Sequence, residues 1–175
     1  MKKIIPALIL LSLVCKSCKK DAAPPAPVSE GLGTISVSID GSTRSFNYYD
    51  QNNNSTAKAV LGTTYNNLYT LTVFGQKRPF FWEDDLSITI VSPVPIIAGT
   101  YTNVAVPNTS LEIWYCPFTI PLQACHVSGS SGLVTISEMS SSSVKGTFNA
   151  ALSYVDNSGT SRTNTLTNGK FNTPF

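Results

Sequence analysis

Apolar and polar residues alternate along most of the chain after residue 33, with the two-residue period of a strand that buries one face. Ile35, Val37 and Ile39 form the first such set, with serine at the positions between them. Asp40-Gly41 follows directly, and this dipeptide is the strongest short-range signal of a β-hairpin. The pattern therefore predicts a hairpin at the start of a β-rich domain.

The same alternation recurs at hairpin-like spacing along the rest of the chain. Apolar sets with period two occur within residues 46–48, 69–73, 86–90, 111–115 and 134–136, and turns are expected at 140–143 and 156–161. Residues 56–61 fit either a short helix or an edge strand. Eight to ten strands, with no convincing helix and no internal repeat, predict an all-β domain. We expect a single antiparallel β-sandwich or a partly closed barrel.

The last strand carries a conflict in its pattern. Residues 144–154 hold a long alternating set that predicts one extended strand. Leu166 and Phe171 in the next strand have opposite parity, so one regular strand cannot bury both. Asn168-Gly169 lies between them, and this pair predicts a β-bulge that restores the register.

The N-terminus has the order of a bacterial secretory signal. Lys2 and Lys3 precede an apolar run over residues 4–14, which is shorter than the about 20 residues that a transmembrane helix needs. Ser17 and Cys18 follow, in the arrangement of a lipoprotein signal-peptidase site. The sequence predicts cleavage before Cys18 and attachment of lipid to that cysteine.

Cys15 is the competing lipidation position. It follows Val14, and a β-branched residue fits the small-residue subsite poorly, whereas Ser17 before Cys18 fits it. Lys16 and Cys15 depart from the usual residues before the cleavage site. We therefore expect a lipoprotein signal peptide over residues 1–17, with Cys18 as the lipidated residue.

A proline-rich segment follows the expected cleavage site. Residues 18–30 contain Pro24, Pro25 and Pro27, which favour extended polyproline geometry. At about 3.1 Å per residue, the twelve residues 19–30 hold the domain of residues 31–175 up to about 35 Å from the lipid surface. The protein is expected to be anchored to a membrane by its lipid without crossing it.

Charge excludes nucleic acid as a partner. The full chain has 12 Lys and Arg against 10 Asp and Glu. Lys2, Lys3 and Lys16 leave with the signal peptide, so nine basic and ten acidic residues remain, a net charge of −1. No basic stripe is left that would bind a phosphate backbone.

Cys116 and Cys125 are the cysteines that remain beside the lipidated one. In an oxidising compartment such a pair predicts a disulfide, which closes a short loop. A redox pair is disfavoured, because the spacing is not Cys-x-x-Cys and the neighbours are mostly apolar. Two buried free thiols are the remaining alternative.

Catalytic and metal-binding patterns are weak. His126 is the one histidine, no G-x-S-x-G sequence occurs, and zinc needs more ligands than the chain offers. Asp50, Asn52 and Asn54 have the initial spacing of a calcium loop, but the match fails at its later positions. The acidic run 83–85 is expected to be solvated, with a calcium site completed by loop carbonyls as the alternative. We therefore expect no catalytic site, no cofactor and no metal.

Aromatic residues are the strongest candidates for binding. Phe80, Phe81 and Trp82 are consecutive, so neighbouring side chains of the three cannot all enter the core. Trp114 alternates with the apolar set of residues 111–115 and shares the opposite face with Glu112. Exposed aromatic rings bind sugar rings or a protein partner. The alternative is that these rings pack in a second layer or under a loop.

Several segments carry a resemblance to a known group of proteins. They are SCKKD, ISVSIDGSTRSF, a GTYT turn at Gly99–Thr102, and the closing VTISEMSSSSVKGTFNAAL and TNGKF. The chain resembles small uncharacterised β-rich lipoproteins of Bacteroidetes-type bacteria. The resemblance implies the fold, a closing β-meander and an envelope location, but it supplies no site residues.

These features together predict a binding or structural module on the cell envelope without catalytic activity. We expect the lipid to hold it at a membrane, the outer membrane above all, facing the periplasm or the surface. A glycan or an envelope protein is the expected ligand, with Phe80, Phe81, Trp82 and Trp114 as contact residues. The alternative is an accessory subunit of an envelope complex with no small-molecule ligand.

Overall fold

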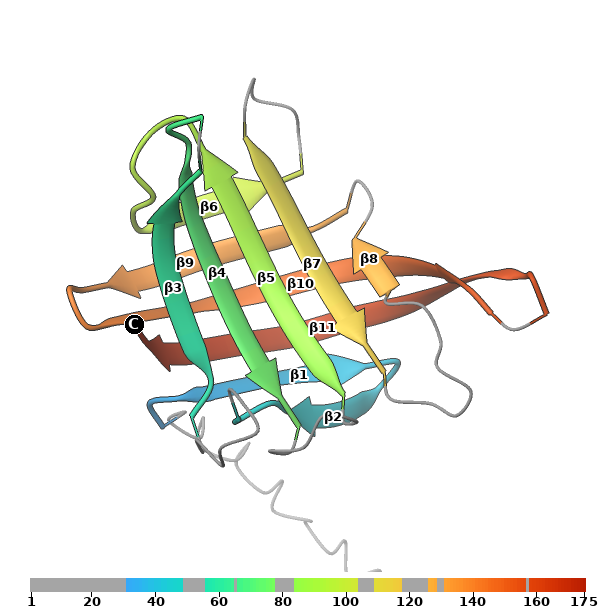
Figure 1. Cartoon of the computed structure of the whole chain (residues 1–175). Helices are drawn as coiled ribbons and strands as arrows, with labels where there is room; N and C mark the ends of the chain where they lie inside the picture. Colours follow the sequence, from blue (N-terminus) through green and yellow to red (C-terminus); the bar gives the residue numbers. More distant parts are fainter. Residues whose placement is uncertain are drawn as a thin grey trace, which may run out of the picture.

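The strands of the domain form two antiparallel sheets that pack face to face, a β-sandwich (Figure 1). The computed structural model describes residues 31–48, 56–64, 66–77, 84–103, 109–117, 126–128 (backbone only), 131–156 and 158–175. These residues form eleven strands and no helix, so the predicted all-β class is confirmed. The strands are β1 (Thr34–Ile39), β2 (Ser42–Ser45), β3 (Lys58–Thr63), β4 (Tyr69–Gln76), β5 (Asp85–Ser92), β6 (Gly99–Thr102), β7 (Ser110–Cys116), β8 (His126–Ser128), β9 (Leu133–Met139), β10 (Ser143–Val155) and β11 (Ser161–Pro174).

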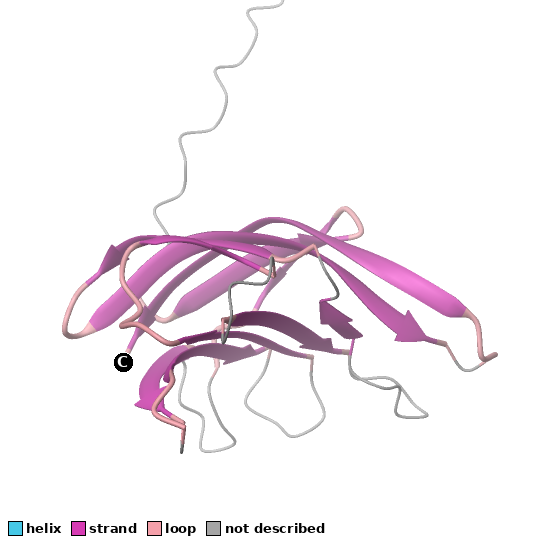
Figure 2. Ribbon diagram, turned by 90° about the horizontal axis from the view of Figure 1, so that it is seen from above, coloured by secondary structure: helices cyan, strands magenta, loops and turns pink. Residues whose placement is uncertain are grey.

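The first layer is the sheet β3-β4-β5-β7, and the second is β6-β9-β10-β11-β1-β2. The strands of the two layers run across one another, and Figure 2 shows the second layer arching over the first. The short strand β8 pairs with β7 on one side and with the far part of β10 on the other, so it joins the layers at one corner.

The core lies between the two layers and follows the predicted alternation. In β5 every second residue is buried, among them Leu86, Ile88 and Ile90. Phe148 of β10 and Phe171 of β11 face them from the second layer, with ring centroids 6.4 Å apart. The inner face of each sheet is thus apolar, and the polar positions of the same strands face outward.

The first hairpin forms as its sequence predicts. Asp40 and Gly41 have φ angles of 49° and 82°, and Ile39 pairs with Ser42 across them. Two consecutive positive φ angles define the type I′ turn that Asp-Gly favours. The Asp40 carboxylate also accepts a hydrogen bond of 2.7 Å from the Thr165 amide, which ties the turn to β11.

The predicted bulge at Asn168-Gly169 is confirmed. Pairing of β11 with β10 passes from Phe148↔Gly169 to Ala150↔Leu166, so three steps in β11 match two in β10. Asn168 has a φ of 54°, and the extra residue lets Leu166 and Phe171 both reach the core. Gly169 is required there, because a Cβ atom would lie 2.5 Å from the Phe148 carbonyl oxygen.

Two parts of the sequence differ from expectation or are decided by the structure. Residues 58–63 form the edge strand β3, which settles the choice between helix and strand for that segment. The GTYT segment is not a turn but strand β6, because Gly99–Thr102 pair with residues of β9. The expected signal peptide and tether, residues 1–30, lie outside the described residues.

We predict that Gly169→Ala lowers the free energy of unfolding by about 1–3 kcal/mol, because its methyl group collides with Phe148 backbone and ring. Urea denaturation followed by tryptophan fluorescence measures the change. Gly31→Ala is the matched control, since nothing lies within 4 Å of its Cβ position. Equal stability of the two variants would show that the bulge tolerates a side chain.

Candidate functional site

A row of side chains crosses the outer face of the β3-β4-β5-β7 sheet. The pairing registers place Lys58 beside Phe74, Phe74 beside Ser87, and Ser87 beside Trp114. All four point away from the core, because residues with the opposite parity in these strands are buried. The aromatic rings of Phe74 and Trp114 therefore lie on the outer face of this sheet.

Trp114 lies where its sequence pattern predicts. Its neighbours Ile113 and Tyr115 are buried, whereas Trp114 is 38% exposed on the outer face. The indole Nε1 donates a hydrogen bond of 3.0 Å to the Glu112 carboxylate, which fixes the orientation of the ring. The alternative of a buried second-layer position for Trp114 is therefore wrong.

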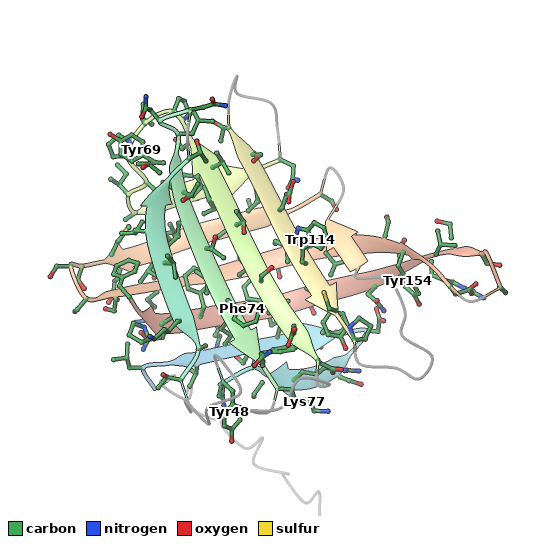
Figure 3. All side chains as sticks on the ribbon, viewed as in Figure 1. Tyr48, Tyr69, Phe74, Lys77, Trp114 and Tyr154 are labelled. Carbon is green, nitrogen blue, oxygen red and sulfur yellow. The ribbon has the colours of Figure 1, made fainter. Side chains whose placement is uncertain are left out.

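Phe74 is the second aromatic residue of the row, and it is half-buried. It lies two strands from Trp114, about 10 Å at ordinary strand spacing, with the small side chain of Ser87 between them. Figure 3 shows both residues on the viewer's side of the first sheet. Phe74 was not among the predicted contact residues, although it shares the outward parity of Thr70 and Thr72.

The adjoining row of the same face is polar. Thr72 pairs with Thr89, and Thr89 pairs with Glu112. The two threonine hydroxyls lie 3.4 Å apart, and a hydroxyl can both donate and accept hydrogen bonds. The outer face thus places flat apolar rings next to hydroxyl and carboxylate groups, which is the pairing of groups that sugar rings require.

A buried charged cluster lies at the end of the sheet where β4 and β5 are connected. Asp84 is 6% exposed and forms an ion pair with Arg44 of β2. The Tyr115 hydroxyl donates to the same carboxylate at 3.0 Å and accepts from Arg44 at 2.6 Å. Because the Lys77 amide also donates to the Asp84 carbonyl, the cluster fixes the two ends of the connection between the strands.

This cluster corrects the expectation for Asp84 of the acidic run 83–85, in which Glu83 lies outside the described residues. Asp84 is not solvated: it is buried and bound to a cation and a phenol. No local pattern predicts the cluster, because Arg44 of β2, Tyr115 of β7 and Asp84, just before β5, meet only through packing of the two layers. Within the described ranges, no group of three or more His, Cys, Asp or Glu could hold a metal ion.

Burial raises the pKa of two groups at this end of the sheet. It raises the pKa of Tyr115, and the Asp84 charge adds to the effect. Burial also raises the pKa of Asp85, while a hydrogen bond from Gln76 opposes the shift. One oxygen of the Asp85 carboxylate is buried without a hydrogen-bond partner, which agrees with the upward direction of its pKa.

Several of the predicted site residues lie outside the described part of the chain. They are Phe80, Phe81, Trp82, Cys18 and Cys125, and the side chain of His126 is likewise not described. Cys116 is at the end of β7, where it pairs with Asp85 across the strands. Of the four predicted aromatic contacts, the structure therefore places only Trp114, and it adds Phe74 two strands away on the same face.

No protein-family model, no curated protein and no solved structure matches the chain. The part of the chain that the structure describes contains no helix that is long and apolar enough to span a bilayer. The geometry of the outer face is thus the basis for a functional assignment.

We predict that Asp85→Asn raises the melting temperature at pH 7. The folded protein binds the Asp85 proton more tightly than the unfolded chain, because burial raises this pKa from its ordinary 3.8. The stabilising contribution of Asp85 is complete below pH 3.8 and is lost as the pH rises through the folded-state pKa. The gain from the substitution should therefore vanish at acidic pH, as scanning calorimetry between pH 3 and 7 measures.

Asp156→Asn is the control with the opposite sign. Hydrogen bonds from Ser158 and Arg162 lower the pKa of Asp156, so its contribution is present at neutral pH and disappears on acidification. This substitution should lower the melting temperature at pH 7. A decrease for Asp85→Asn as well would contradict the assigned direction of its pKa.

Proposed function

We propose that the protein is a lipid-anchored binding module of the cell envelope, and that it binds glycan on the outer face of the β3-β4-β5-β7 sheet. The observation that carries the proposal is the row in which Phe74 and Trp114 flank Ser87. Sugar rings stack on aromatic rings through their C–H faces, while their hydroxyls need polar partners. Thr72, Thr89 and Glu112 supply those partners in the adjoining row.

The arrangement favours an extended saccharide over a single sugar. Two rings about 10 Å apart, with the small Ser87 between them, contact separate units of one chain. The strands fix the backbone under both rings, and the hydrogen bond to Glu112 orients Trp114, so less freedom of that side chain is lost on binding. No catalytic step is part of the proposal, and no cofactor or metal ion is required for it.

The anchor and the disulfide complete the proposal. Lipid on Cys18 would hold the domain at the outer membrane through the segment of residues 18–30. The chain returns to the sheet at His126, which lies opposite Tyr115. A Cys116–Cys125 disulfide would continue this ladder by one pair, and directly paired positions meet the Cα spacing of a disulfide. The resemblance to Bacteroidetes-type lipoproteins supports the same location.

An accessory role in an envelope protein complex is the second candidate. Val94 and Ile97 in the connection between β5 and β6 are 62% and 65% exposed. The connection is held in place, because the Tyr101 hydroxyl accepts from the Ile97 amide at 3.0 Å and donates to its carbonyl at 2.8 Å. Fixed, exposed aliphatic side chains favour contact with another protein.

We predict that Trp114→Ala and Phe74→Ala each weaken glycan binding about tenfold or more, because each removes a stacking surface. A glycan array probed with residues 31–175 selects the oligosaccharide, and isothermal calorimetry then measures the dissociation constants. Trp114→Ala should keep a melting temperature close to that of the unchanged domain. Phe74→Ala should lower the melting temperature moderately, because Phe74 is half-buried.

Tyr69→Ala is the matched control, since Tyr69 is also 38% exposed but lies at the opposite end of the sheet, on its inner-face parity. It should leave the affinity unchanged. Equal losses in all three variants would show that the row is not the site. Unchanged binding in Trp114→Ala would sink the glycan proposal and favour the accessory role.

We also predict that Cys18→Ser abolishes incorporation of labelled palmitate and releases the protein from the membrane fraction. The acyl chains attached to this residue are the expected source of membrane affinity. Cys15→Ser should leave both properties intact. Loss of label in Cys15→Ser alone would move the lipidation site to that cysteine.

A further inference from the structure

Strand β3 is an open edge of the first sheet. Among the described residues it pairs with β4 alone, and it ends the order of strands. Its side chains Val60 and Leu61 are 51% and 47% exposed. Open edges with apolar side chains pair with strands of other chains unless charge, proline or a cover prevents it.

The edge strands β2 and β6 of the second layer are shorter and more polar than β3. The edge strand β2 has four polar residues, including Arg44, and β6 also has only four residues. β3 has six residues, contains no proline, and carries Lys58 as its one charge. The contrast marks β3 as the edge at which another strand would add.

A cavity of about 340 Å³ adjoins this edge. Its lining comes from β3, from the turn before β10 and from the residue after β11, so both layers contribute to it. Its lining residues are Lys58, Ala59, Val60, Leu61, Ser141 and Phe175. Ala59 is the smallest of the lining apolar side chains and is buried, whereas Val60 and Leu61 beside it are about half exposed.

We propose that β3 pairs with β3 of a second copy of this chain, antiparallel and about a two-fold axis at Val60. Directly opposed residues of an antiparallel pair share a face, so the axis must pass through a residue. An axis at Val60 sets Val60 against the partner's Val60 on the outer face. It also sets Lys58 against the partner's Gly62, so that no like charges meet.

The same register fits the cavity. On the inner face it places the partner's Leu61 opposite Ala59, at the mouth of the cavity that Ala59 and Phe175 line. By symmetry, Leu61 enters the corresponding cavity of the second copy. The two most exposed apolar side chains of the edge are thus both covered by one pairing, and each small residue faces a larger one.

This dimer extends the molecule beyond a single binding face and does not rest on glycan binding. Pairing at β3 joins two copies of the β3-β4-β5-β7 sheet into one continuous sheet. Two rows of Phe74 and Trp114 then lie on the same outer face. A polymer that contacts both rows would be held with an affinity above that of either row.

Cysteine crosslinking of the full-length chain in cells tests the register. In Val60→Cys the two sulfur atoms face each other across the axis, and the oxidising envelope should link them. In Leu61→Cys the sulfur faces the partner's Ala59 instead. The yield of crosslinked dimer should be at least about fivefold lower than for Val60→Cys. Val155→Cys is the matched control, because Val155 is 58% exposed but lies on the β10–β11 hairpin.

A reducible dimer band that is specific to Val60→Cys is the expected result on a non-reducing gel. The proposal is overturned if Val60→Cys stays monomeric, if Val155→Cys crosslinks equally, or if the linked product contains a different protein. A stronger band from Leu61→Cys contradicts the register.

Sedimentation of the purified lipoprotein in mild detergent provides the second test. Val60→Lys opposes two ammonium groups across the axis and should weaken dimerisation at least about tenfold. Val155→Lys should leave it unchanged. A Val60→Glu chain mixed with the Val60→Lys chain should restore a dimer of the two variants. A monomeric unchanged protein at all concentrations, or no effect of Val60→Lys, would overturn the proposal.

Discussion

The bulge in β11 is the constraint on which the rest of the structure depends. β11 lies between β10 and β1 in the second layer, and its register shifts against both neighbours at the same place. Without the additional residue, either Leu166 or Phe171 would face solvent, because strand side chains alternate strictly. The Asn149 side chain accepts from the Asn168 amide at 3.0 Å and holds the bulge. The curved second layer then covers the flatter first one (Figure 2).

The packing of the two layers limits where a ligand can bind. The inner faces are filled by the core, so the first sheet can offer only its outer face. That face is held by strand pairing on β4, β5 and β7, and the Arg44–Asp84–Tyr115 cluster fixes one end of it. Stacking on a rigid surface loses little conformational entropy, which suits recognition of repetitive saccharides. The open edge at β3 would extend the same surface into a second copy.

Much of the fold follows from local pattern. The two-residue period predicts which face of each strand is buried, and the Asp40-Gly41 turn and the Asn168-Gly169 bulge are confirmed because each is a local backbone requirement. Segments of weak pattern fared worse. The resemblance implied a turn at GTYT, whereas pairing with β9 makes it a strand.

The candidate site was only partly predictable for the same reason. Parity alone placed Trp114 outward, and it could have placed Phe74 as well, since Phe74 follows Thr70 and Thr72 at the same spacing. That the two rings share one row depends on the register of three strands, which no local pattern encodes. The burial of Asp84 likewise depends on Arg44, 40 positions away.

Nuclear magnetic resonance of residues 31–175, titrated with the oligosaccharide that the array selects, tests the central claim most directly. The account predicts that amide shifts concentrate on the outer-face rows of β4, β5 and β7, with the indole N–H of Trp114 among the largest. Shifts confined to the connection between β5 and β6 or to the β10–β11 turn, or no shifts with any glycan, would contradict it.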